Sequence, residues 1–341
     1  MQTELLDSID KLLADLDVPR EVRLLNEQLS AGQNLSTDKL WQALQASGFV
    51  DVMVPEAAGG AGLGWSDAWQ VLFAVGRHGL PLPVGATMYA RALMAELGAE
   101  PSTEIITMSG FVQHGPDGVM MVRELPAARL ATLAMVQDHD TIYLLPMSKA
   151  TLTDVGGPGC FDAQASWPRS VVNQSTLGTA ERGLLARGLA LVLAAQIAGA
   201  ADRAMQMTLQ YANERNQFGK PIGKFQAVQQ QLSEMAEWVF SARMASQLGA
   251  QRHDSQAPAL LAAIAKTQTS AVAAPVAEVA HAVHAAIGIT AEYDLQIYTR
   301  RLYEWARLGG AQPYWAEQIG QQALSSDHLL DFMRQGVFQE A

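Results

Sequence analysis

Residues 211–236 read YANERNQFGKPIGKFQAVQQQLSEMA, and this stretch joins two segments that have a helical pattern. The first pattern ends near Arg215, a tight FGKPIG turn follows, and the second pattern starts at Phe225 and Gln226. The simplest interpretation is a pair of helices joined by a rigid turn, which requires no ligand. The alternative is that the turn presents Arg215 and Phe218 to a planar anionic molecule, such as a nucleotide cofactor.

The composition is that of a large protein with much buried surface. The 341 residues are 49% hydrophobic and only 17% charged, so the chain can form two or more cores. The formal net charge of −11 argues against a nucleic-acid-binding protein, which would carry a basic face. The single cysteine, Cys160, rules out an intramolecular disulfide and fits a reducing compartment. The acidic N-terminus is unlike a targeting peptide, and the apolar run 188–201 is shorter than the ~20 residues of a membrane span. We therefore expect a soluble cytoplasmic protein.

The chain divides into three parts by pattern. Residues 1–98 are predicted to form a helical domain, residues 99–175 a reduced middle β domain, and residues 176–341 a C-terminal helical bundle. The glycine-rich stretch 54–64 lacks the Gly-Lys-Ser/Thr ending of a phosphate-binding loop, so we interpret it as a bend. The longest helices are expected at 182–214, 225–252 and 257–287, the last with a kink at Pro275. The predicted class is a mostly α protein with a small central β domain.

The sequence resembles the acyl-CoA dehydrogenase family over nearly its whole length. The stretch 211–236 carries the most specific resemblance, and VPEAAGGAGLGWSDAWQVLFAVGRHG (54–79) and GITAEYDLQIYTRR (288–301) support it. The resemblance implies an N-terminal helical domain, a β domain and a C-terminal four-helix bundle. Family members are flavoproteins that remove two hydrogens across Cα–Cβ of an acyl-CoA thioester. A glutamate takes the α proton, FAD accepts the β hydride, and the subunits assemble as dimers of dimers.

The resemblance also implies roles for three residues of the turn. Arg215 would pair with the pyrophosphate of FAD held by a neighbouring subunit, because a guanidinium suits phosphate oxygens. Phe218 would lie near the adenine end, and Gln226 would hydrogen-bond the same cofactor. These three are the predicted cofactor-binding residues, and the FAD would be shared across a subunit interface.

The rest of the flavin machinery departs from the family pattern. A glutamine of the family's cofactor segment falls on His281 or Ala282, and its paired glycines fall on Ala285 and Ala286. The middle domain lacks the family's T-E-P-x-x-G-S-D segment and its W-x-T/S flavin contacts. The resemblance therefore predicts that this chain alone holds the flavin ring poorly.

The catalytic base of the family is also missing. Its usual position falls on Gly309, and the alternative position used by some members falls on Leu189, beside Ala190. Glu181 and Glu304 are the nearest carboxylates, but neither is in register with the base. We interpret both as solvated surface groups, with a displaced base as the alternative.

Other candidate residues have structural explanations. One helix face carries Glu278, His281 and His284, but the sequence indicates no further metal ligand beside them. We therefore predict no metal site. Cys160 has no neighbouring base that would mark it as a nucleophile. The remaining aromatic set is interpreted as packing and consists of Trp305, Tyr314 and Trp315.

Three functions remain open from the sequence. In the first, the chain is the non-catalytic subunit of a heterotetramer with two copies of each chain, in which a longer partner carries the glutamate. Such enzymes act on bulky substrates, notably CoA thioesters of steroid side chains. In the second, it is a self-sufficient homotetrameric dehydrogenase with a relocated base. In the third, it is a flavin-free scaffold protein.

Overall fold

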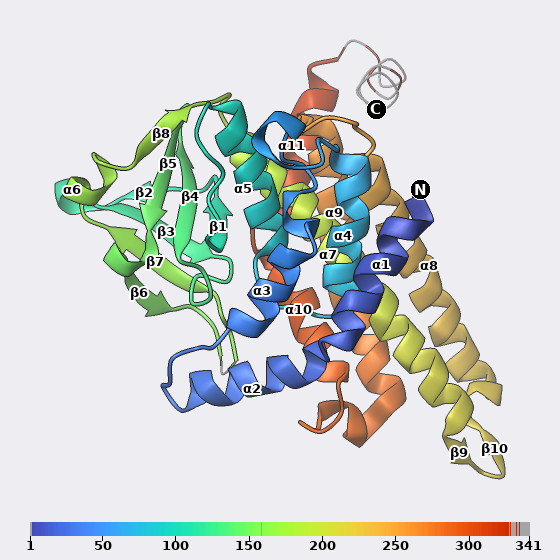
Figure 1. Ribbon diagram of the computed structural model, residues 1–341. Helices are drawn as coiled ribbons and strands as arrows, with labels where there is room; N and C mark the ends of the chain where they lie inside the picture. Colours follow the sequence, from blue (N-terminus) through green and yellow to red (C-terminus); the bar gives the residue numbers. More distant parts are fainter. Residues whose placement is uncertain (1, 158, 327, 329–331, 333, 335–341) are drawn as a thin grey trace.

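The computed structural model describes residues 2–157, 159–326, 328, 332 and 334. Two small β-sheets lie on one side of a set of long helices, and the N-terminal helices pack beside both (Figure 1). The mostly α class with a small β region is confirmed. The predicted third part runs to Ala341, and most of its last fifteen residues lie outside the described ranges.

The N-terminal part is helical as expected. Its α-helices are α1 (Gln2–Asp15), α2 (Val18–Ser30), α3 (Asp38–Ala46), α4 (Trp65–Arg77) and α5 (Val84–Glu96). Short 3₁₀ turns at Phe49–Asp51 and Glu56–Ala58 occupy the connection between α3 and α4, so the glycine-rich stretch is a bend, as predicted. Helices α4 and α5 are buried along most of their length, because their apolar residues cover the whole helix circumference.

The middle part forms two four-stranded sheets. In the first sheet the order is β1 (Ile106–Ser109), β4 (Leu133–Asp138), β5 (Thr141–Pro146) and β8 (Thr176–Thr179). In the second sheet the order is β2 (Gln113–His114), β3 (Met120–Leu125), β7 (Ala163–Trp167) and β6 (Thr151–Asp154). Strand β1 pairs parallel with β4, and the other pairs are antiparallel. A short helix, α6 (Arg169–Val172), precedes β8.

Strand β8 lies beyond the predicted boundary at residue 175. Its Thr179 pairs with Thr141 of β5, so the four residues Thr176–Thr179 belong to the first sheet. Alternation of side chains is weak in this strand, which explains why the sequence pattern did not separate it from the following helix. The boundaries drawn at residues 98 and 175 stay predictions.

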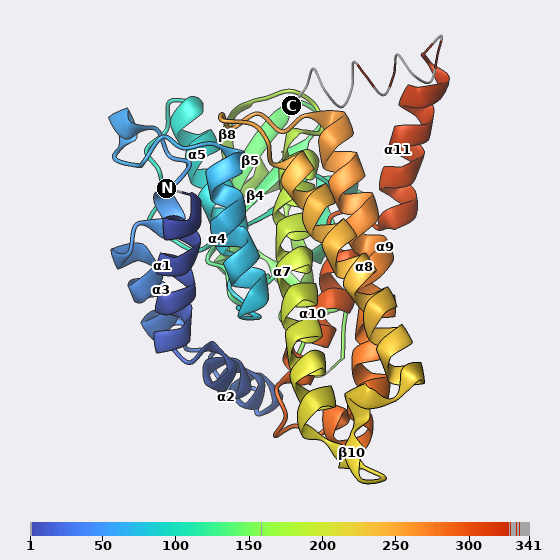
Figure 2. The same ribbon diagram turned by 90° about the vertical axis from the view of Figure 1, so that its right-hand side faces the viewer.

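The C-terminal part is a bundle of long helices. It contains α7 (Leu184–Glu214), α8 (Gln226–Gly249), α9 (Ala259–His284), α10 (Leu295–Arg307) and α11 (Gln312–Leu324), with a 3₁₀ segment at Ala285–Ile289. Figure 2 shows α7, α8 and α9 running side by side along the molecule. Helix α9 continues through Pro275, and the bundle has no break there.

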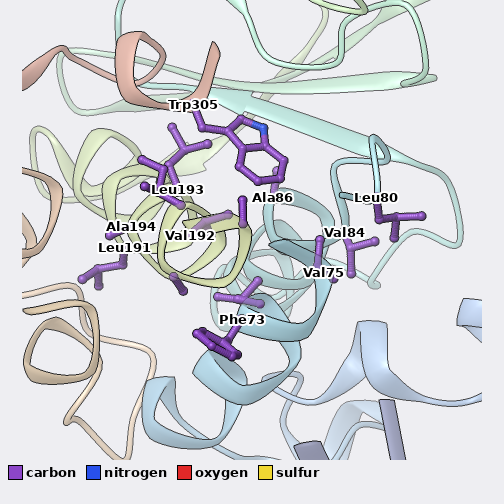
Figure 3. Packing of buried hydrophobic residues seen from close by; sticks show 14 of the residues in the cluster. Phe73, Val75, Leu80, Val84, Ala86, Leu191, Val192, Leu193, Ala194 and Trp305 are labelled. Carbon is purple, nitrogen blue, oxygen red and sulfur yellow. The ribbon is translucent and has the colours of Figure 1, made fainter. Parts of the chain in front are cut away.

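The close contact between α4 and α7 depends on glycine. A Cβ built on Gly76 would overlap the carbonyl oxygen of Gln196, and one built on Gly199 would overlap that of Phe73. The two helices therefore approach at backbone distance. The core around this crossing includes Phe73, Val192 and Trp305 (Figure 3).

Two helical segments are long and apolar enough to cross a membrane by length and composition alone. They are Leu184–Glu214 and Ala259–Ile289. In the most apolar window of the first, 94% of the residues are buried within the protein, which accounts for its composition as a core helix. In the second window only 39% are buried, so much of this apolar helix faces outward.

Candidate functional site

The turn after α7 is a small exposed hairpin. Strand β9 (Asn216–Gln217) pairs with β10 (Lys220–Pro221), and the amide of Ile222 donates to the carbonyl of Arg215 at 2.8 Å. Phe218 occupies the left-handed region at φ 50° and is 92% exposed. A bulky residue in this conformation, with its ring in water, indicates a functional rather than a packing role.

The three predicted cofactor-binding residues lie on or beside this hairpin. Arg215 and Gln226 are exposed like Phe218, and no ion pair involves Arg215 within the described ranges. The ring of Phe225 lies edge-on to that of Phe218, with 6.2 Å between the ring centroids. Lys220 Nζ lies 4.3 Å from the centroid of the Phe225 ring. The hairpin thus has internal contacts that hold its shape, and it exposes the Arg215 side chain and the Phe218 ring to solvent.

The end of α9 lies against the same end of α7. His284 stacks on Tyr211 at 4.5 Å, donates to the carbonyl of Ala280 at 2.8 Å, and contacts the Tyr293 hydroxyl at 3.2 Å. Burial lowers the pKa of His284, which favours the neutral ring. His284 is therefore a satisfied core histidine. His281 forms a hydrogen bond with Thr299 at 2.9 Å, and no cluster of three metal-ligating side chains occurs in the part of the chain that the structure describes.

Ala285 has an unusual conformation next to this histidine. Its φ of 53° and ψ of −135° lie in a region that glycine favours. This is one of the two positions where the family pattern has paired glycines. The backbone keeps the glycine conformation although the residue is alanine, at a cost of ~1–3 kcal/mol.

A cavity of about 850 Å³ lies between the second sheet and the junction of α10 with α11. Gly309 and Gly310 form part of its wall, with Phe111, Arg123 and Glu124 opposite. Arg307 also lines it and pairs with Glu124 at 3.0 Å, so an ion pair joins the sheet to the end of α10. Glu124 is the only carboxylate among the residues that line this cavity, and sequence reasoning did not nominate it.

The glycine wall of this cavity is held from both sides. Trp315 Nε1 donates to the carbonyl of Gly309 at 2.9 Å. Lys266 is fully buried and donates to the carbonyls of Trp305 and Ala306, also at 2.9 Å. Burial lowers the pKa of Lys266 to about 7. These contacts fix the last turn of α10 and the loop after it.

The two predicted base positions come together at this wall. A Cβ built on Gly309 would lie 3.1 Å from Leu189 Cγ and 2.9 Å from Leu193 Cδ1. Leu189 is 2% exposed and Ala190 is fully buried. Apolar packing therefore fills the place where the family resemblance puts the base.

The prediction that Glu304 is a surface group is wrong. Glu304 is 8% exposed and accepts from Arg301 Nη1 at 2.5 Å, because this face of α10 packs against the segment before β7, where the Phe161 ring lies 5.3 Å from the Arg301 guanidinium. Glu181, in contrast, is exposed and pairs with Arg187 at 2.7 Å, as expected of a surface group. Neither side chain lines the cavity at Gly309.

Asp162 is a buried carboxylate that sequence reasoning missed. It is 5% exposed and accepts the amide of Ala127 at 2.8 Å. Burial, with repulsion from Glu304, raises its pKa to about 6. Burial likewise raises the pKa of Cys160 to about 11, which leaves an unreactive thiol.

In the aromatic set, Trp305 and Trp315 are buried packing residues, whereas Tyr314 is 40% exposed.

The hairpin and the cavity of one chain lie far apart. Leu189 touches the cavity wall near the start of α7, and Arg215 follows the end of α7, roughly 39 Å further on at 1.5 Å per residue. Both views place the hairpin at the free end of the bundle, away from the sheets (Figures 1 and 2). A ligand that contacts Arg215 therefore does not reach the Gly309 cavity of the same chain.

Comparison with known proteins identifies the family. The model of the acyl-CoA dehydrogenase N-terminal domain matches residues 2–102, and that of the C-terminal domain matches residues 188–324. Acyl-CoA dehydrogenase IpdE2 of Mycolicibacterium smegmatis is 31% identical over 277 residues, which cover 80% of this chain and 83% of that protein. IpdE2 of Mycobacterium tuberculosis is 29% identical over 291 residues, covering 80% of this chain and 82% of that protein.

Solved structures share the fold. The ChsE4–ChsE5 complex of Mycobacterium tuberculosis superposes with a TM-score of 0.84 at 20% identity, covering 96% of this chain and 98% of that one. A steroid acyl-CoA dehydrogenase variant, Tcur3481–Tcur3483, gives 0.78 at 21% identity, covering 95% and 99%. Together with the matched domains and the 31% identical relative, these findings show that the chain belongs to the acyl-CoA dehydrogenase family.

Proposed function

We propose that this chain is the non-catalytic subunit of a heteromeric, FAD-dependent acyl-CoA dehydrogenase. It lends its hairpin to the FAD site of a longer partner, and the partner carries the catalytic glutamate. The observation that carries this proposal is the separation within one chain: an exposed Arg215–Phe218 hairpin at one end, and at the other a cavity walled by Gly309, which packs against Leu189.

The residues of the hairpin fit the phosphate end of FAD. Arg215 offers a planar set of donors without an ion-pair partner in the described residues, and Phe218 offers an exposed ring beside it. Gln226 adds an amide at the start of α8. When bound, FAD supplies the hydride acceptor of the reaction. The side chains here would hold its pyrophosphate and adenine, and would leave proton abstraction to the partner.

The Gly309 cavity of this chain fits the flavin ring and substrate poorly. Leu189 and Leu193 fill the base position, and the Glu124–Arg307 ion pair joins two of the cavity walls. Both side chains of this pair are largely exposed, so it contributes only ~0–1 kcal/mol, and the poor fit rests on the apolar packing at the base position. The chain therefore contributes to a site in its neighbour rather than forming its own.

The outward apolar face of α9 supports assembly with a partner. In its most apolar window only 39% of the residues are buried within one chain, and Phe240 and Met244 of the neighbouring α8 are 59% and 69% exposed. Exposed apolar side chains of this kind are suited to burial against another subunit. Complexes of two different subunits among the structural neighbours favour a heterotetramer with two copies of each chain.

A bulky acyl-CoA, such as the thioester of a steroid side chain, is the proposed substrate class, and the cytoplasm the proposed location. One neighbouring structure is described as a steroid acyl-CoA dehydrogenase, which favours this class. A second candidate is a self-sufficient homotetramer whose base has moved to Glu124, since that carboxylate lines the cavity.

Co-expression tests the proposal. The chain is produced alone and together with a longer family member that retains the catalytic glutamate, and both preparations are examined for visible flavin absorbance and mass in solution. A colourless chain that yields a yellow heterotetramer with the partner supports the proposal. A yellow, active homotetramer from this chain alone overturns it and favours Glu124 as the base.

A further inference from the structure

A second cavity lies between α1, α4 and α8, on the side of the bundle that faces away from the two sheets. Its volume is about 470 Å³, within the ~300–1,000 Å³ typical of small-molecule sites. Ser66, Trp69 and Gln70 of α4 form one wall, and Arg243 and Gln247 of α8 form the other. The proposed subunit role does not use this cavity.

Gln70 is the unexplained residue of this cavity. It is the one polar side chain among the buried residues of α4, and it is 4% exposed. Neither its amide oxygen nor its amide nitrogen has a hydrogen-bond partner among the residues that the structure describes. Each unpaired buried polar group costs ~1–3 kcal/mol. A glutamine retained at that cost, in a helix that otherwise buries apolar residues, indicates that a ligand provides its partners.

Arg243 supplies the charge of the site. Its guanidinium lies 5.3 Å from the ring centroid of Phe73 and 6.0 Å from that of Trp69, which orients its donors along the cavity wall. It makes no ion pair in the described part of the chain, and no carboxylate lines the cavity. Trp69 is itself fixed by a 3.0 Å bond from Nε1 to Ser246 Oγ. Trp69 is thus held in place beside the cation of Arg243. Asp202 interacts electrostatically with Arg243, but it pairs with Arg77 and does not line the cavity.

We propose that this cavity binds a small hydroxycarboxylate. The carboxylate pairs with Arg243, since charge-assisted bonds to a guanidinium are the strongest that the cavity offers. Gln70 needs both an acceptor for its N–H and a donor for its oxygen. A hydroxyl beside the carboxylate supplies the donor, and the carboxylate or the hydroxyl oxygen supplies the acceptor. The proposal does not rest on the subunit role, since neither Arg215 nor Gly309 lines this cavity.

Titration of the purified assembly with malate and with succinate tests the proposal, since the two acids differ only in the hydroxyl. We expect saturable malate binding, and succinate binding that is weaker by about 2- to 12-fold, the worth of one neutral hydrogen bond. Arg243→Met should weaken malate binding by about tenfold or more, whereas Arg20→Met, at an exposed site on α2, should leave it unchanged.

Gln70→Leu provides the decisive variant, because it keeps the size of the side chain and removes the amide. It should abolish the preference for malate over succinate and raise the unfolding temperature of the ligand-free protein. Absence of saturable malate binding overturns the proposal. Three other results would also overturn it: equal binding of the two acids by the unmutated protein, an unchanged preference after Gln70→Leu, or destabilisation by that change. The first two would mean that the amide does not recognise the hydroxyl. The third would mean that the amide already has partners in the ligand-free protein.

Discussion

A Cβ placed on Gly309 would lie 3.1 Å from Cγ of Leu189, so the two positions that the family resemblance assigns to the base occupy one apolar contact. Gly309 also adopts φ 64°, a conformation that favours glycine. The wall of the cavity is therefore adapted to a residue without a side chain.

Gly309→Ala tests this packing. The added Cβ would crowd Leu189 and Leu193 in addition to straining the backbone, and overpacking of this kind costs ~1–3 kcal/mol. Gly98→Ala is the matched control, because Gly98 has φ 76° but no atom within 4 Å of the added Cβ. Denaturant unfolding should show the larger loss at Gly309, and equal losses would mean that the wall is loosely packed.

Arg215→Ala should lower the FAD content of the assembled complex and leave the fold intact. A lost guanidinium–pyrophosphate contact costs ~1.5–3 kcal/mol, or about 10- to 150-fold in affinity. FAD is measured by absorbance after exhaustive dialysis. Arg182→Ala, at an exposed arginine before the start of α7, is the control and should retain its flavin. The same FAD occupancy in both variants would show that the hairpin is only a turn.

Asp162 should make stability depend on pH. Its pKa rises from 3.8 in the unfolded chain to about 6 in the folded one, so the folded state binds the extra proton between these values. The relative stabilisation is fully present below pH ~3.8 and is lost as the pH rises through about 6.

Asp162→Asn removes this titration and keeps an oxygen to accept from Ala127. The difference in unfolding free energy between the original protein and the variant should therefore shift in favour of the original as the pH falls from about 7 to about 4.5. Denaturant unfolding at the two pH values measures it. A difference that does not change with pH would mean that Asp162 titrates normally.

The long helices and the hairpin were predictable because they depend on local pattern. Neighbouring residues determine the helical periodicity of 184–214 and 226–249 and the FGKPIG turn between them. The burial of Glu304 was not predictable, since it depends on the segment before β7 packing against α10. Asp162 and Glu124 were missed for the same reason: nothing in their own segments indicates the helix that faces them.

The sequence alone marks Gln70 as a candidate functional residue. A glutamine within the apolar run of α4 breaks the pattern of a buried helix, and such breaks are where function is expected. Its partner across the cavity, Arg243, lies on a different helix far along the chain. The pairing becomes visible only in three dimensions.

The central claim, that this chain supplies no base, is tested by anaerobic reduction of the flavin with a bulky acyl-CoA. Complexes are reconstituted with Glu124→Gln, Glu181→Gln or Glu304→Gln in this chain, or with the matching change at the partner's catalytic glutamate. Loss of a general base costs at least ~10²-fold in rate. We predict that the three changes in this chain slow bleaching only a few-fold, and that the change in the partner abolishes it. A hundredfold slowing from Glu124→Gln, Glu181→Gln or Glu304→Gln with FAD still bound would contradict the account.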